Sequence, residues 1–310
     1  MILTLTVNPA IDRNITVDQL VFEDRAYILD TRESAGGRGI NNSCVIHSFG
    51  GKTLAIATAG GETGARLKQL LGCCGFAVDT VEVQAATRTN LNISDRQGLT
   101  IKLNEKGAAV DAGELRLIEQ AVGRRLPEAR WFMLCGSMPP GMPSDFYARL
   151  IETAKALGVK TLLDTDGEAL EAGLEAGPTA VAPNQQEAER LLNKALLTRA
   201  QFQDAAERIR LMGAQMVLLS LGSRGCVGAR EGVIVEAVPP RVEVVCPIGA
   251  GDALAASWVW AMRRNDDFSD ALRWGVAAGT ASATLPGVSF ASFEQTRAIY
   301  EQVQLRETTR

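Results

Sequence analysis

Short apolar runs rich in β-branched residues recur along this chain, and segments of helical period separate them. The runs typical of strands are residues 2–7, 53–59, 131–135, 160–164, 179–183 and 216–220. Residues 144–157, 185–193, 199–212, 253–263 and 268–284 combine helix-forming residues with the apolar spacing of an amphipathic helix. Strands that alternate with helices form a mainly parallel sheet with helices on both faces. The sequence therefore predicts a doubly wound α/β domain.

Two regions depart from this alternation, residues 13–34 and 87–106. Each alternates polar and apolar residues around turn signals, and neither has room for a crossover helix. We expect two antiparallel hairpins that form a small one-faced sheet, called the lid below. Its candidate apolar residues are Ile15, Val17, Leu91, Ile93 and Leu103. An identical lid across a twofold axis would cover such a face, which predicts a homodimer that pairs lid to lid.

The composition limits the classes of partner. The 310 residues include 32 basic and 36 acidic ones, with a formal net charge of −4 and no basic tract suited to a nucleic-acid backbone. There is neither a charged leader nor an apolar run near the roughly 18 residues of a membrane span, so we expect a cytoplasmic protein. Six cysteines without metal-binding spacing are expected to be buried thiols. The single histidine, His47, argues against a Ser/His/Asp triad.

The stretch PIGAGDALAA, residues 247–256, places Gly249, Ala250, Gly251 and Asp252 directly before a run of small apolar residues that is typical of a helix. Glycine permits backbone conformations closed to other residues, and a helix start leaves several N–H groups without partners. These groups and the helix dipole attract anions. Taken alone, the string also fits a glycine turn followed by an Asp N-cap.

A second glycine cluster, GGRGINN at residues 36–42, follows a predicted lid strand and opens another helix. It lacks the spacing of GxGxxG, and the chain contains no GxxxxGK[ST]. The sequence therefore disfavours both a Rossmann dehydrogenase and a P-loop enzyme.

Five motifs occur in an order that resembles the ribokinase-like (pfkB-type) carbohydrate kinases. They are NPAID at 8–12, GGRGINN at 36–42, PNQQE at 183–187, SLGSRG at 220–225 and GAGD at 249–252. NPAID, TRTN at 87–90 and CGSMPPG at 135–141 are most similar to the subgroup of 1-phosphofructokinase, tagatose-6-phosphate kinase and minor 6-phosphofructokinase. The resemblance spans nearly the whole chain and implies one ribokinase-like kinase domain over residues 1–310, with the lid attached.

The resemblance implies a role for each part of the GAGD motif. Asp252 would take the proton from the attacking sugar hydroxyl, while the N–H groups of Gly249, Ala250 and Gly251 would stabilise charge on the transferred phosphoryl group. Phosphoryl transfer requires mainly positioning and charge stabilisation, which such a helix start provides.

The resemblance also implies ATP, Mg²⁺ and K⁺ sites. Asn184 and Glu187 would hold Mg²⁺ through its waters, although N-x-x-E fits a capping box equally well. The nucleotide would contact Asn184, Ser220, Gly222, Gly225, Gly251, Ala278, Gly279 and Ser282, which alternatively form a tight turn and a small-residue helix interface. Ala182 stands where the family commonly has Lys, which bears on nucleotide affinity. Backbone carbonyls near Cys246, Ile248, Ser282, Leu285, Gly287 and Ser289 would bind K⁺.

A phosphorylated acceptor would need cations away from the transfer centre. The candidates in or beside the lid are Arg25, Arg38, Arg88 and Lys102. Arg88 matches the subgroup's phosphate-contacting arginine, and Arg38 stands where GGKG members have Lys. By resemblance, Asp12 and Asn41 would hold sugar hydroxyls, with Gly37 and Gly39 beside them.

The hypothesis is therefore ATP-dependent phosphorylation of fructose 1-phosphate, fructose 6-phosphate or tagatose 6-phosphate, which yields a ketohexose bisphosphate and ADP. Two alternatives stay open: a kinase for a neutral sugar or nucleoside, and a ligand-binding regulator that lacks the chemistry. Asp252 with its glycines argues against the regulator, and Ala182 argues for it.

Overall fold

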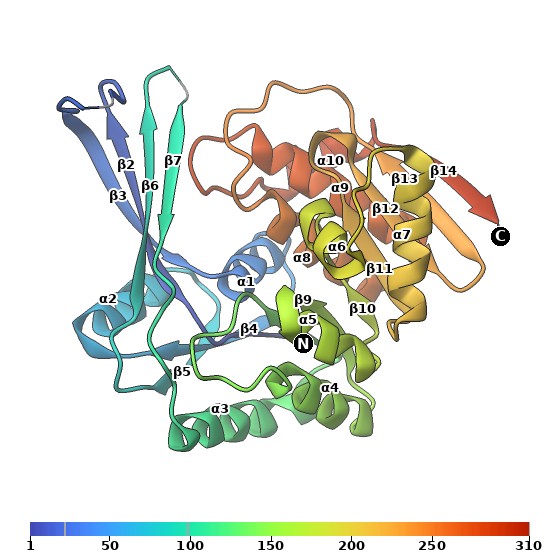
Figure 1. The fold of residues 1–310 in the computed structure, drawn as a ribbon, viewed down its shortest axis with the longest axis horizontal. Coiled ribbons are helices and arrows are strands. Elements are labelled where there is room, and N and C mark those ends of the chain that lie inside the picture. Colours follow the sequence, from blue (N-terminus) through green and yellow to red (C-terminus); the bar gives the residue numbers. More distant parts are fainter. Residues whose placement is uncertain (22, 98, 310) are drawn as a thin grey trace.

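The computed structural model describes residues 1–21, 23–97 and 99–309, which form a large sheet with helices on both faces and a smaller sheet beside it (Figure 1). Within these residues, seven parallel strands make most of the large sheet: β1 (Ile2–Thr6), β4 (Thr53–Ala59), β5 (Ala77–Glu82), β8 (Trp131–Cys135), β9 (Lys160–Asp164), β10 (Ala180–Val181) and β11 (Met216–Ser220). Three antiparallel strands extend one edge: β12 (Cys226–Arg230), β13 (Val233–Val238) and β14 (Gln304–Thr309). The order is β14-β13-β12-β11-β10-β9-β8-β1-β4-β5.

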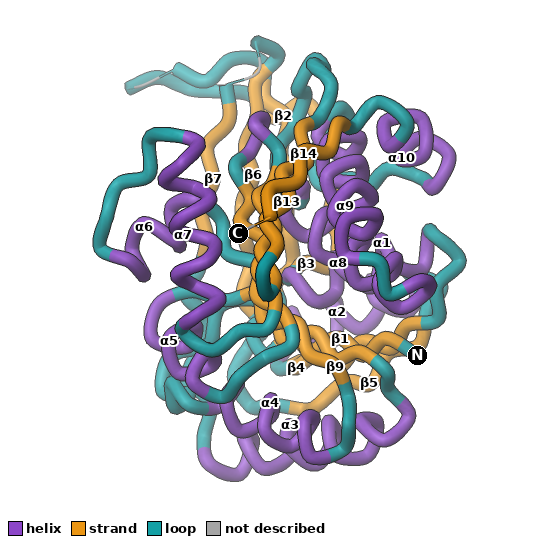
Figure 2. The backbone as a smooth tube through the Cα atoms, turned by 90° about the vertical axis from the view of Figure 1, so that its right-hand side faces the viewer, coloured by secondary structure: helices purple, strands orange, loops and turns teal. Residues whose placement is uncertain are grey.

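Two helix layers cover this sheet, which Figure 2 shows between them. One layer holds α1 (Arg38–Ser48), α2 (Gly61–Gly72), α8 (Ala250–Asn265), α9 (Phe268–Ala283) and α10 (Phe293–Tyr300). The other holds α3 (Ala112–Arg125), α4 (Phe146–Ala156), α5 (Gly167–Glu175), α6 (Gln185–Leu192) and α7 (Arg199–Leu211). Alternate residues of β1 enter opposite cores, Ile2 on the α8 side and Leu3 and Leu5 on the other. The predicted doubly wound α/β fold is confirmed.

The lid is a four-stranded sheet within the described residues, made of β2 (Ala10–Val17), β3 (Ile28–Gly36), β6 (Arg88–Asp95) and β7 (Thr100–Asn104). The two predicted antiparallel hairpins are present, and a parallel pairing of β2 with β6 joins them. Asp12 lies opposite Asn90, and Asn90 lies opposite Asn104, so these polar side chains share one face.

Of the candidate apolar residues, Ile15, Leu91, Ile93 and Leu103 share the opposite face of the lid. Val17, at the end of β2, is buried and lies next to a register shift between β2 and β3.

The cysteines fit the expectation of buried thiols only in part. All six are free, but only Cys135 and Cys226 are buried, whereas Cys73 is exposed at the end of α2. In the described part of the chain, no helix is long and apolar enough to cross a membrane.

Candidate active site

A cleft of about 550 Å³ lies where the carboxyl ends of the parallel strands meet the polar face of the lid. Ligands of open α/β sheets bind at this edge, and the volume is in the range of small-molecule sites. Many of the residues singled out from the sequence line it: Asp12, Gly37, Arg38, Asn41, Arg88, Lys102, Asn184, Glu187, Ser220, Gly249, Gly251 and Asp252. Segments far apart in the sequence thus converge on one cleft.

The start of α8 forms one wall of the cleft. Gly249 caps the helix with φ of 81°, a left-handed conformation that favours glycine. A Cβ atom at this position would also lie 3.0 Å from the ring of Phe290. Gly249 and Gly251 line the cleft, so the first turn of α8 presents its N–H groups there.

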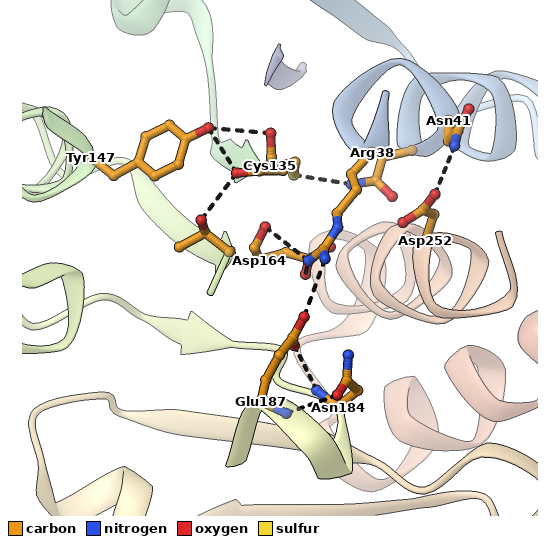
Figure 3. A network of polar contacts seen from close by, with 11 residues as sticks. Arg38, Asn41, Cys135, Tyr147, Asp164, Asn184, Glu187 and Asp252 are labelled. Atoms are coloured by element: carbon orange, nitrogen blue, oxygen red, sulfur yellow. Dashed lines mark hydrogen bonds and ion pairs between the residues drawn. The ribbon is translucent and has the colours of Figure 1, made fainter. Parts of the chain in front are cut away.

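Asp252 lies in the first turn of α8, and Asn41 Nδ2 donates a hydrogen bond of 2.7 Å to its Oδ2 (Figure 3). Burial raises the pKa of the Asp252 carboxyl to about 7, and the negative charge of Asp164 adds to the shift. Arg38 and the Asn41 hydrogen bond act in the opposite direction. A carboxyl group with a pKa near neutrality is suited to accept a proton in this pH range.

Arg38, the first residue of α1, joins two buried carboxylates across the cleft (Figure 3). Its Nη1 lies 2.6 Å from Asp164 Oδ1, and its Nη2 lies 3.1 Å from Glu187 Oε1. Asp164, and after it Glu187, raise the pKa of the Arg38 guanidinium. From the sequence, Arg38 was a candidate cation for a distal phosphate. In the structure its guanidinium bonds instead to Asp164 of β9 and Glu187 of α6.

Asn184 and Glu187 form the capping box that their spacing permits. Asn184 Oδ1 accepts a 2.9 Å hydrogen bond from the Glu187 N–H, and Glu187 Oε2 accepts one of 2.9 Å from the Asn184 N–H. Burial raises the pKa of Glu187, and Arg38 opposes that shift. The carboxylate and amide oxygens match the ligands that Mg²⁺ prefers, so this corner fits the ion chemically. Direct coordination by Glu187 Oε1 would compete with Arg38.

The lid supplies the polar residues of the opposite wall. Asn90 Nδ2 donates a 2.8 Å hydrogen bond to Asp12 Oδ1, and burial raises the pKa of Asp12 while Asn90, Arg88 and Lys102 oppose the rise. Arg88 also fastens the lid to the main domain. Its Nη2 donates to the Asn8 carbonyl at 2.9 Å and its Nη1 to the Glu105 carbonyl at 2.7 Å. A guanidinium has five N–H groups, so Arg88 retains N–H groups that could donate hydrogen bonds to a ligand.

Several residues chosen from the sequence do not line the cleft in the described part of the chain: Arg25, Gly39, Ala250, Gly222, Gly225, Ala278, Gly279 and Ser282. Arg25 is exposed in the β2–β3 connection. Gly222 and Gly225 form a tight turn after β11. Gly279 packs on α8, because a Cβ there would lie 2.8 Å from the Ala250 carbonyl oxygen. These positions form a turn and a small-residue interface, and their contact with a nucleotide stays a prediction.

The segments proposed for K⁺ come together at two points: residues 245–246 meet the end of α9, and a Cβ at Gly249 would lie 3.6 Å from Val288 Cγ1. The N–H groups of Val245 and Cys246 donate to the Ala283 carbonyl at 2.9 and 3.0 Å. Ser282 Oγ accepts a hydrogen bond of 3.1 Å from the Ala291 N–H.

Several polar residues of the cleft were not predicted from the sequence: Asn8, Asn90, Asn104, Ser137, Asp164 and Asp166. Asp164 ends a predicted strand and Asp166 follows it, which is the usual place for functional side chains in a parallel sheet. Asn90 belongs to the TRTN string. The strand end at Asp164 and the TRTN string could both have been recognised in the sequence.

The chain matches the pfkB family carbohydrate kinases over residues 5–295. It belongs to this family. The chain is 33% identical to ATP-dependent 6-phosphofructokinase isozyme 2 of Escherichia coli K12, with 96% of this chain and 97% of that protein covered. It is 27% identical to 1-phosphofructokinase of Vibrio cholerae, with 98% and 96% covered. The Escherichia coli phosphofructokinase-2 structure in complex with potassium superimposes with a TM-score of 0.92, at 33% identity and with 97% and 98% of the chains covered.

As a pfkB family kinase, the chain is an enzyme of carbohydrate metabolism and resembles the phosphofructokinases. The names of the relatives specify different fructose phosphates. Membership of the family therefore does not identify the acceptor, and the residues of the cleft must be considered.

Proposed function

We propose that this pfkB family kinase transfers the γ-phosphoryl group of ATP to a hydroxyl of a ketohexose phosphate and releases a ketohexose bisphosphate and ADP. Fructose 1-phosphate, fructose 6-phosphate and tagatose 6-phosphate are the candidate acceptors. One observation carries the proposal: the carboxyl group of Asp252 and the start of α8 share a cleft with the lid cations Arg88 and Lys102. A phosphorylated sugar would meet these cations while one of its hydroxyls approaches Asp252.

The residues of the cleft support a division of roles. Asp252, oriented by Asn41, would accept the proton of the attacking hydroxyl. The N–H groups of Gly249, Ala250 and Gly251 would stabilise charge on the transferred group. Asp12 would accept hydrogen bonds from sugar hydroxyls beside Gly37, while Gly39 would act from behind the cleft by letting α1 pack closely on β1.

ATP and Mg²⁺ would occupy the β10–β11 side of the cleft. Asn184 and Glu187 would hold Mg²⁺ through its waters, and the ion would neutralise phosphate charge. The proposed nucleotide contacts are Ser220, Gly222, Gly225, Gly251, Ala278, Gly279 and Ser282. A K⁺ ion would lie where residues 245–246 meet the end of α9, which is consistent with the relative crystallised with potassium.

The residues 1–310 would act as a single kinase domain that dimerises through the lid and works in the cytoplasm. One form of the Escherichia coli relative is described as tetrameric, so larger assemblies occur among related chains.

The decisive experiment is an ADP-release assay over a panel of phosphorylated and unphosphorylated sugars, each with MgATP. We expect kcat/KM to be at least tenfold higher for one ketohexose phosphate than for any neutral sugar. A preference for a neutral sugar or nucleoside would replace the proposal with the alternative kinase. The engagement of Arg88 by two backbone carbonyls is the observation that favours that alternative.

A further inference from the structure

The cationic side chains of the cleft fall into two groups. Among its described lining residues, the cations are Arg38, Arg88 and Lys102. Arg88 and Lys102 belong to the lid, and their charges act on Asp12. Arg38 begins α1 in the main domain, and its charge acts on Asp252, Glu187 and Cys135. Arg38 is thus the cation on the side of the cleft where Asp252 and the start of α8 lie.

The surroundings of Arg38 carry an excess of negative charge. Asp164 and Glu187 are both bonded to the guanidinium and retain only 8% and 3% of their side-chain exposure. Asp252 lies close enough to raise the Arg38 pKa further. At the end of β10, Ala182 lines the same wall and brings no compensating cation. A polyphosphate entering here would meet one guanidinium among three carboxyl groups.

The bonds of Arg38 to the two carboxylates differ in length. Asp164 Oδ1 accepts Arg38 Nη1 at 2.6 Å, and the 32% exposed arginine side chain still reaches the cleft. Glu187 Oε1 accepts Nη2 at 3.1 Å, while Oε2 already accepts the Asn184 N–H at the start of α6. A divalent cation at Glu187 Oε1 would compete with Nη2 for this oxygen, whereas the shorter bond from Nη1 goes to a different carboxylate, Asp164. Arg38 can therefore exchange one partner while Asp164 keeps it in place.

We propose that Arg38 is the chain's own cation for the phosphates of the donor nucleotide. Asp164 holds the guanidinium, and Nη2 leaves Glu187 for a phosphate oxygen when that carboxylate interacts with a divalent cation. This inference rests on the proposed function, and it assigns Arg38 to the phosphoryl donor instead of the distal phosphate of the acceptor. Asp164 is then a positioning residue.

The first test compares equilibrium binding of a non-hydrolysable ATP analogue with Mg²⁺ and of fructose 6-phosphate, each measured by calorimetry on the full chain. Arg38→Met should weaken analogue binding by about tenfold to a hundredfold, because a charge-assisted hydrogen bond is lost. Binding of fructose 6-phosphate should stay within about twofold. The matched control is Arg13→Met, which breaks the lid surface pair with Glu33 and should change neither affinity.

The opposite pattern, weaker fructose 6-phosphate binding with unchanged analogue binding, would overturn the proposal and restore Arg38 to the acceptor. Failure of the proposed function is a separate result, seen when wild-type protein binds the analogue but releases no ADP with any sugar phosphate.

A second test uses the exchange of partners and needs no divalent metal. With a chelator present, Glu187→Gln removes the carboxylate that retains Nη2, so the analogue should bind several-fold more tightly than to wild type. The gain should disappear in Glu187→Gln/Arg38→Met. A gain that persists in the double variant would overturn the proposal, because it would reflect general loss of negative charge. Circular dichroism of each variant checks that the fold is retained.

Discussion

Asp252 combines the three properties expected of a general base in this cleft. It lies beside the N–H groups of α8, it is oriented by Asn41, and burial raises its pKa to about 7. Only the position beside a glycine-rich helix start was readable from the sequence. The pKa depends on Asp164 and Arg38, which reach Asp252 from β9 and α1.

Asp252→Asn should retain the fold and nucleotide affinity, because the amide is nearly isosteric and can still hydrogen bond with Asn41. Turnover should fall by about two to four orders of magnitude, the usual contribution of a positioned base. Steady-state kinetics with saturating ATP measures the loss. Turnover within threefold of wild type would remove Asp252 from the proposed chemistry.

The pH dependence should follow the ionisation of Asp252. Its deprotonated form accepts the proton, so kcat/KM should be nearly constant above the pKa of about 7 and fall about tenfold per unit below it. The measurement is a pH profile at constant ionic strength. The residual activity of Asp252→Asn should not show this fall of kcat/KM at low pH. A wild-type profile that is flat between pH 5 and pH 8 would contradict this assignment.

Substitution of Arg88 tests whether the lid binds a phosphorylated sugar. Arg88→Ala should weaken use of the ketohexose phosphate by about tenfold to a hundredfold, because one charge-assisted contact to the distal phosphate is lost. The ATP KM should barely change. Arg297→Ala is the control, since Arg297 is an exposed arginine of α10 that pairs with Glu301, away from the lid. Unchanged kinetics with the sugar phosphate would favour the neutral-sugar kinase.

At the scale of elements, the sequence predicted the parallel strands of the large sheet except β5, and it did not predict helices α2, α3, α5 and α10. The predicted strands at 53–59, 131–135, 160–164 and 216–220 coincide with β4, β8, β9 and β11, because buried parallel strands are continuous apolar runs. The antiparallel edge was missed. Glu231-Gly232 between two apolar runs is a hairpin signal for β12 and β13, but the pairing of β13 with β14 joins residues about 70 positions apart and leaves no local pattern.

The packing of α1 on β1 explains why its glycine-rich start carries functional residues. Gly39 lets the helix approach so closely that a Cβ there would lie 2.5 Å from Thr6 Oγ1 and 2.7 Å from the Leu5 carbonyl oxygen. The sequence suggested a substrate role for Gly39. In the structure it is buried and brings Arg38 and Asn41 to the cleft.

Gly39→Ala should therefore destabilise the protein by about 1 to 3 kcal/mol through overpacking, and it should lower turnover because α1 carries Asn41. Denaturant unfolding and steady-state kinetics measure the two effects. Gly123→Ala in α3 is the matched control, since a Cβ there meets nothing within 4 Å. It should stabilise the protein by about 0.5 kcal/mol, because alanine has the higher helix propensity. Equal stability of Gly39→Ala and wild type would contradict the packing argument.

At the scale of the whole molecule, the lid has an apolar face that the rest of the described chain does not fully cover. It projects from the main domain (Figure 1), with its polar face on the cleft and Ile15, Leu91, Ile93 and Leu103 on the other face. The sequence predicted these two faces from alternation alone, because strand side chains alternate in direction. It did not predict that Val17, at the end of β2, is buried beside a register shift between β2 and β3.

A second lid would cover the apolar face, so wild-type protein should sediment as a homodimer at micromolar concentration. Leu103 is 52% exposed on this face, and Leu103→Asp would bury a charge in the lid–lid contact. That variant should sediment as a monomer. Leu157→Asp is the matched control, because Leu157 is equally exposed, at 52%, but lies at the end of α4. It should remain a dimer. A wild-type monomer, or dimers of both variants, would show that the apolar face of the lid is not the subunit contact.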